Sequence, residues 1–150
     1  FLDASTEIEC ACARLAALRM DPGERQALMA LHARMGEDLF DESEKYAELN
    51  NEFHELIYLG AHNEVLLDLI LKMRVRLWPV YRVQLTPAVR ARQSYAEHDR
   101  IVSAILKGDA IASEVAMRAH MSSSALMLER LQGKSIGDAD ESGSRQGEAR

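Results

Sequence analysis

The chain has 150 residues, of which 47% are hydrophobic, and a formal net charge of -6. This length is typical of one domain, and this apolar fraction is enough to fill its core. The negative charge argues against a segment that binds nucleic-acid phosphates by itself, because such binding needs lysines and arginines clustered on one face. Because the sequence has no signal peptide and no apolar run of about 18 residues, we expect a soluble, cytoplasmic protein.

Apolar residues recur three and four positions apart, whereas Gly and Pro lie mainly where a helix should end. This pattern predicts an all-α fold. We expect a first helix from about Asp3 to Met20 and a second from about Pro22 to Leu39, because proline suits the first turn of a helix. The expected buried stripe of the first helix is Ile8, Cys12, Leu15 and either Ala16 or Leu18. The second helix should bury Leu28, Leu31, Met35 and Leu39.

The third helix should begin near Asp41 or Ser43, where acidic side chains complement the helix dipole, and end near Gly60. A fourth helix follows a cap at Asn63. Pro79 lies inside this helix and should bend it, because proline removes a backbone hydrogen bond. Such a bend would open space inside the bundle.

The fifth helix should start at Thr86-Pro87 and stop at Gly108, and Asp109 should cap a sixth helix that runs to about Leu131. Residues 132–150 are rich in Gly, Ser and acidic residues, which predicts a flexible polar tail. We therefore expect one domain over residues 1–131. Its predicted architecture is an antiparallel bundle of about six to seven helices around a central pocket.

Two cysteines, Cys10 and Cys12, stand two positions apart in the first predicted helix. Side chains at this spacing diverge by about 200° on a helix, so the pair is poorly placed to bridge or to share a metal. We expect both to be reduced and packed, as in a cytoplasmic protein.

Four polar residues lie in apolar helical stretches. Asn50 and His54 are four positions apart, so they share one helix face. His98 is in phase with Ile101 and Ile105, and His120 is in phase with Ala116 and Met117. Burying three imidazoles and an amide costs free energy unless their polar atoms are paired. A divalent metal ion would pair them all, whereas hydrogen bonds inside the core would account for one or two of the histidines alone.

Neutral imidazoles suit zinc, nickel, manganese or iron, with zinc the first choice, and an amide oxygen is compatible with the harder ions of this series. Three histidines and one oxygen leave coordination positions open. Water or the carboxylate of a small organic acid could occupy them. His32 shows no partner in the sequence pattern and His62 lies in a connection between helices, so both are interpreted as surface or packing residues.

The order of these residues resembles the FCD domain, the C-terminal effector-binding domain of GntR-type bacterial transcription regulators. The family pattern of Asp or Asn, two residues, then Phe-His is matched by Asn50, Phe53 and His54. Its later half, His, Ile, Gly-Asp, Met and His, is matched in order by His98, Ile101, Gly108, Asp109, Met117 and His120. The resemblance implies metal ligands at Asn50, His54, His98 and His120, a homodimer, and operator DNA bound through a winged helix-turn-helix domain upstream of Phe1.

Two departures from the family pattern bear on the effector. Asn50 stands where many relatives have Asp, and a neutral amide is a weaker ligand. Ser5 stands where relatives often have an inward Arg that pairs with an effector carboxylate. Arg74, Arg76 or Arg82, near the predicted bend, are candidates to replace it. Arg82, Ser94 and Tyr58 are our candidate effector-binding residues.

We therefore predict a metal-dependent sensor of a small carboxylate metabolite that controls DNA binding allosterically. A metal-dependent hydrolase is the alternative, but the sequence has no HExxH motif and no carboxylate in phase with the histidines to act as a general base. A metal-free structural dimerisation bundle is the other alternative, and it leaves the inward histidines without a role.

Overall fold

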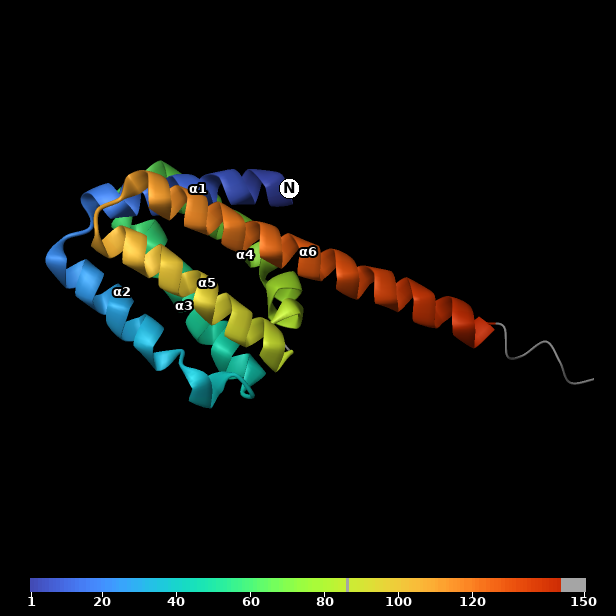
Figure 1. The fold of residues 1–150 in the computed structure, drawn as a ribbon. Coiled ribbons are helices and arrows are strands. Elements are labelled where there is room, and N and C mark those ends of the chain that lie inside the picture. The colour runs from blue at the N-terminus through green and yellow to red at the C-terminus, as the bar shows by residue number, and fades with distance from the viewer. Residues whose placement is uncertain (86, 144–150) are drawn as a thin grey trace, which may run out of the picture.

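A computed structural model places every described helix of the chain in one bundle (Figure 1). It describes residues 1–85 and 87–143, with only the backbone described for Val80, Val83, Gln84, Leu128 and residues 131–143. The elements are α1 (Leu2–Arg19), α2 (Pro22–Arg34), the short 3-10 helix η1 (Glu37–Leu39), α3 (Ser43–Gly60), α4 (Glu64–Gln84), α5 (Ala88–Leu106) and α6 (Ala110–Gly143). The predicted all-α fold is confirmed. Among the described residues, no helix is both long and apolar enough to cross a membrane.

The start of α2 is fixed by a reciprocal cap. The Glu24 amide donates to the Asp21 carboxylate at 2.8 Å, and the Asp21 amide donates to the Glu24 carboxylate at 2.9 Å, which satisfies two backbone donors that the first turn leaves unpaired. The helix ends at Arg34, so the predicted end at Leu39 was wrong. Gly36 adopts an extended conformation there, and the chain turns through η1 before α3.

The start of α6 follows the prediction, but its end does not. Gly108 ends α5 in the left-handed region at φ 69°, and the Ala112 amide donates to the Asp109 side chain at 3.0 Å. The helix then continues to Gly143, beyond the predicted end near Leu131. No proline interrupts this stretch, and an isolated glycine costs a helix only about 1 kcal/mol. Figure 1 shows this C-terminal half projecting from the bundle. Residues 144–150 of the predicted tail lie outside the described residues.

The helix α1 is in contact with α3, α4, α5 and α6. Cys12 and Ala16 of its predicted stripe are buried, whereas Leu18 is 60% exposed, so Ala16 and not Leu18 completes the stripe. Both cysteines are free and buried, as predicted. Burial raises the pKa of Cys10 to about 11 and that of Cys12 to about 12, so both remain thiols near neutral pH.

The connection between α4 and α5 falls partly outside the described residues. The helix α4 continues past Pro79 to Gln84, and the bend predicted at this proline stays a prediction. Pro87 is the N-cap residue of α5, close to the predicted helix start. Thr86, the other residue named for that start, is not among the described residues.

Candidate metal centre

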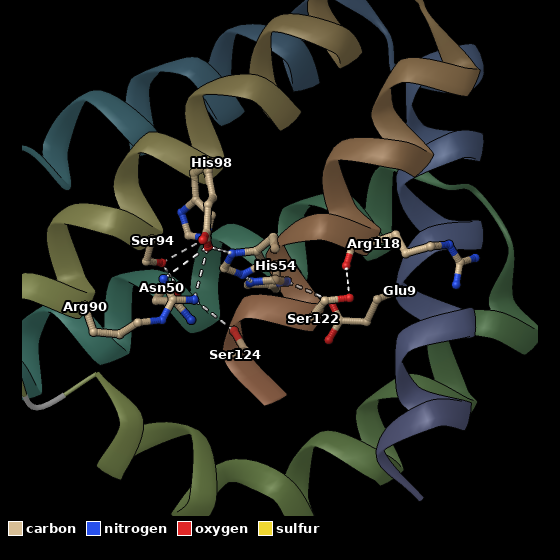
Figure 2. Close-up of polar contacts among 11 residues, drawn as sticks. Glu9, Asn50, His54, Arg90, Ser94, His98, Arg118, Ser122 and Ser124 are labelled. Atoms are coloured by element: carbon tan, nitrogen blue, oxygen red, sulfur yellow. Dashed lines mark hydrogen bonds and ion pairs between the residues drawn. The ribbon is translucent and has the colours of Figure 1, made fainter. Parts of the chain in front are cut away.

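Three buried histidines from three helices meet inside the bundle, and Figure 2 labels two of them, His54 and His98. His54 lies on α3, His98 on α5 and His120 on α6. One ring nitrogen from each lies within 4.8 Å of the others, and none of the three residues is more than 3% exposed. The structure therefore brings together the three histidines that the sequence pattern singled out, in an arrangement that could hold a metal ion.

The rings of His54 and His120 face each other through their Nε2 atoms, which are 3.2 Å apart. On the opposite side of each ring, Nδ1 lies 2.7 Å from a carboxylate oxygen, of Glu9 for His54 and of Glu97 for His120. An ionised carboxylate only accepts hydrogen bonds, so in a neutral imidazole the proton is on Nδ1 and Nε2 carries a lone pair.

Two lone pairs directed at each other in a dry interior repel unless a cation lies between them. Two nitrogens bound to one ion at about 2.1 Å, with an angle between roughly 90° and 109°, lie about 3.0–3.4 Å apart. The observed 3.2 Å between the Nε2 atoms of His54 and His120 falls within this interval. This geometry fits a bound divalent ion.

His98 is placed differently from the other two histidines. Its ring stacks on Phe53 with a centroid distance of 4.0 Å, and its Nε2 lies 3.5 Å from the Ser94 hydroxyl. Its Nδ1 is buried and has no hydrogen-bond partner among the described residues. A buried nitrogen without a partner is costly, and a metal ion would relieve that cost.

Asn50 lies one turn before His54 on α3 and is 5% exposed. Its side-chain oxygen accepts a hydrogen bond from the Ser94 hydroxyl at 3.4 Å. The residue also lines a small cavity together with His54 and His120. An amide oxygen is therefore available beside the imidazoles as a neutral oxygen donor.

Glu9 and Glu97 were not among the site residues predicted from the sequence. Glu97 points away from its neighbour His98, as expected for adjacent helical residues, but it reaches His120 on α6 instead. Glu9 lies on α1 within a stripe of buried residues, and it is itself fully buried. A charged residue in such a stripe was the available signal. Arg90, which pairs with Glu97, had no predicted role, and Arg74, which pairs with Glu9, was predicted only as a candidate to contact the effector.

Two of the three imidazoles, those of His54 and His98, are neutral near pH 7. Burial lowers the pKa of His54 to about 4, despite the opposing effect of Glu9, and burial also lowers the pKa of His98 well below its usual value. For Glu9, burial alone would raise the pKa, but His54 and Arg74 outweigh it and lower the pKa to about 2. Neutral imidazole is the form that binds metal.

The cavity beside the histidines is small. The space in it that a water molecule can enter is only about 10 Å³, which is room for about one water molecule. The residues that line it are Asn50, His54, Arg74, Tyr81, Leu85, His120, Met121 and Ser124. The cavity can therefore accept one ion or one water, and a metabolite would have to displace side chains to enter.

The candidate effector residues divide into two groups. Tyr58 and Ser94 are fully buried beside the histidines, although neither is among the described residues that line the cavity. The Arg82 side chain is 52% exposed and donates to Glu44 at the surface. Ser5, aligned with the family's inward Arg, is buried and its hydroxyl has no hydrogen-bond partner among the described residues.

The two remaining histidines also have acidic partners. His62 lies near the surface with its Nε2 2.9 Å from Glu24, in line with the predicted surface role. His32 is 6% exposed, stacks on Tyr95, and its Nε2 lies 2.8 Å from Asp99. The sequence pattern showed no partner for His32 because Asp99 lies on another helix.

Comparison with known families settles the class of domain. The family model described as FCD domain matches residues 1–123. The chain belongs to the FCD family. FCD domains are regulatory, effector-binding domains of transcription regulators, so the resemblance carried by the histidine pattern is confirmed. A search of curated proteins found no match to this FCD domain.

Proposed function

We propose that this FCD domain is a metal-dependent sensor of a small carboxylate metabolite in a GntR-type regulator. The observation that carries the proposal is the convergence of three buried histidines, with two Nε2 atoms 3.2 Å apart. His54, His98 and His120 would hold the ion, and Asn50 would supply an oxygen. Zinc is the first choice because it accepts imidazole nitrogens readily, and nickel, manganese or iron are the alternatives.

The charges around the site favour an anionic effector. Asn50 is neutral, and the two carboxylates behind the histidines are each paired with an arginine, Glu9 with Arg74 and Glu97 with Arg90. A bound divalent ion would therefore keep its double positive charge, and a bound cation is often the dominant charge of its site. A carboxylate would neutralise part of that charge.

An unpaired donor near the cavity supports the same effector class. Arg74 lines the cavity, and its Nε is buried without a hydrogen-bond partner among the described residues. Buried donors in native proteins are nearly always paired. We therefore assign the carboxylate-binding role to Arg74, in preference to the half-exposed Arg82.

The small cavity suggests how binding is transmitted. A metabolite is larger than the space present, so its entry has to shift side chains on α4 and α6, among them Tyr81 and Met121. In a homodimer, such a shift would change the placement of upstream winged helix-turn-helix domains on operator DNA. A coupling free energy of about 1–3 kcal/mol is enough for allosteric control.

A hydrolase is less well supported by the same geometry. Activation of a metal-bound water calls for a free general base. Glu9 and Glu97 are the carboxylates behind the histidines, and each is already bonded to one histidine and one arginine. We therefore favour sensing over hydrolysis.

The proposal is tested by thermal melts of the zinc-loaded and the chelator-treated domain with a panel of mono-, di- and tricarboxylates. We expect at least one carboxylate to raise the melting temperature of the zinc form by several degrees and to leave the metal-free form unchanged. Arg74→Lys should weaken this shift, and Arg82→Ala should retain it. Equal shifts with and without zinc, or no shift with any carboxylate, would contradict the proposal.

A further inference from the structure

Two series of hydrogen-bonded side chains end at the two facing histidines, and each runs from an arginine through a glutamate to a histidine. One joins Arg74, Glu9 and His54, and the other joins Arg90, Glu97 and His120. The glutamates lie on different helices, α1 and α5. The same arrangement is thus built twice from unrelated parts of the fold.

The first series is entirely buried. Arg74 Nη1 donates to Glu9 Oε1 at 3.1 Å, and the other oxygen of this carboxylate, Oε2, accepts from His54 Nδ1 at 2.7 Å. Arg74 is held in turn by the Asn51 side chain, to which its Nη2 donates at 3.1 Å. Each Glu9 oxygen therefore has a fixed partner. If the His54 ring turned over, its hydrogen bond to Glu9 Oε2 would be lost.

The second series is formed by residues from α5 and α6. Arg90 donates through both terminal nitrogens to Glu97 Oε2 at 3.1 Å, and the same oxygen accepts from His120 Nδ1 at 2.7 Å. Arg90 also donates to the Ser124 hydroxyl at 3.0 Å. This network fixes the His120 ring in the same sense as the first network fixes His54.

His98 has no comparable support. Its Nδ1 has no partner among the described residues, and its closest polar contact is the Ser94 hydroxyl at 3.5 Å from Nε2. The ring is held mainly by stacking on Phe53. Two of the three imidazoles are thus oriented by carboxylates, and the third is oriented by packing.

We propose that Glu9 and Glu97 are positioning residues of the metal centre. Each holds one imidazole in the Nδ1–H tautomer, so that the Nε2 lone pairs of His54 and His120 are aimed at the ion before it binds, and His98 completes the site. The inference rests on the proposed metal centre. Carboxylates behind metal-bound histidines set ring orientation and ligand basicity, and their loss typically lowers metal affinity about 10–100-fold.

The first test uses the metal-free domain and does not depend on metal binding. Long-range ¹H–¹⁵N correlation spectra at pH 7.5 report which ring nitrogen of each histidine carries the proton. We expect Nδ1–H for both His54 and His120. In Glu9→Gln, Arg74 should keep the amide oxygen and turn the amide NH₂ toward His54, so His54 should change to the Nε2–H tautomer while His120 stays unchanged. An Nε2–H tautomer for His54 in the native domain would overturn the inference.

The second test measures zinc affinity by competition with a chromophoric chelator. We expect Glu9→Gln and Glu97→Gln each to weaken zinc binding about 10–100-fold, with helix content by circular dichroism unchanged. Glu7→Gln is the matched control, because Glu7 lies on the same helix and its carboxylate pairs with Arg118 at the surface. Native affinity in both core variants would refute the positioning role.

The two tests separate the inference from the proposed function. If the native domain shows the expected tautomers and binds no zinc, the metal proposal fails and the positioning role fails with it. If the native domain binds zinc but Glu9→Gln changes neither tautomer nor affinity, only the positioning role is wrong.

In the double variant Glu9→Gln with Arg74→Met, the side-chain oxygen of the introduced amide is free to face the ring and should return His54 to the Nδ1–H tautomer.

Discussion

His54 and His120 are separated by 66 positions in the sequence, yet their Nε2 atoms lie 3.2 Å apart in the core. When both rings are neutral, each donates its Nδ1–H to a carboxylate, and neither facing nitrogen then has a proton to share. A core that places two lone pairs in contact gains stability from a cation at that point. The metal-free and metal-bound forms of the domain should therefore differ in stability.

Replacing Asn50 with Asp should have opposite effects on the metal-free and the metal-bound domain. An ionised carboxylate at this buried position costs more than the roughly 1–3 kcal/mol of an unpaired neutral group when no ion is present, but it is a stronger ligand than an amide when one is. We expect a lower melting temperature in chelator and tighter zinc binding than native. Thermal melts and zinc competition assays measure both.

The control for this substitution is Asn63→Asp. Asn63 caps α4 by accepting from the Leu66 amide at 3.1 Å, and Asp caps helices about as well as Asn. This variant adds the same charge away from the histidines and should leave zinc affinity unchanged. Equal changes in both variants would mean that net charge, and not coordination by residue 50, is responsible.

The metal-free domain should lose stability as the pH falls below 6.5. The pKa of His54 in the folded domain is lowered to about 4 and that of His98 is lowered well below 6.5, so the unfolded chain takes up protons that the folded chain does not. Each of these histidines then lowers the free energy of unfolding by up to about 1.4 kcal/mol per pH unit.

Glu9 extends this dependence to lower pH. Its pKa in the folded domain is lowered to about 2, so the stability that it contributes above pH 4.5 is lost as the pH falls toward 2. Urea unfolding in the presence of chelator at pH 7.5, 6.5, 5.5, 4.5 and 3.5 measures the free energy of unfolding over both ranges. A free energy that stays constant down to pH 4.5 would contradict burial of neutral histidines.

Gly60→Ala should destabilise the fold through a close contact between helices. A Cβ at Gly60 would lie 2.5 Å from Met20 Cγ, and Met20 is itself buried. Overpacking of this kind typically costs about 1–3 kcal/mol. Chemical unfolding of the variant measures the loss.

Gly36→Ala is the matched control, because a Cβ at Gly36 meets its nearest atom at an ordinary 3.5 Å. We expect its stability to stay within about 0.5 kcal/mol of native, as for substitutions away from packed features. A larger loss in Gly36→Ala than in Gly60→Ala would show that the contact between Gly60 and Met20 is not the limiting one.

The sequence predicts the helices well because local chemistry sets most of their ends. Asp21 with Glu24 starts α2, and Gly108 with Asp109 separates α5 from α6. The predicted helix ends are wrong where packing between elements, or continued growth of a helix, determines where the helix stops. Gly36 breaks the second helix early, and α6 runs past Leu131 because nothing in its sequence compels it to stop there.

The inward faces of the histidines follow from helical phase, since His98 shares its face with the buried Ile101 and Ile105. The carboxylates behind the rings could not be assigned in this way. Glu97 is adjacent in sequence to one histidine but contacts another, His120, and such pairing depends on how α5 and α6 cross. A buried charge within an apolar stripe indicates that the residue has a partner, but it does not show which residue the partner is.

The most direct test of the metal centre is the zinc content of the purified domain after reconstitution and removal of excess ion. We predict about one zinc per chain for the native domain and for His62→Asn, which replaces a surface histidine at a positive φ of 46° with a residue that tolerates it. We predict none for the double variant His98→Ala with His120→Ala. A native domain without zinc, or a double variant that retains it, would contradict a metal centre at the three histidines.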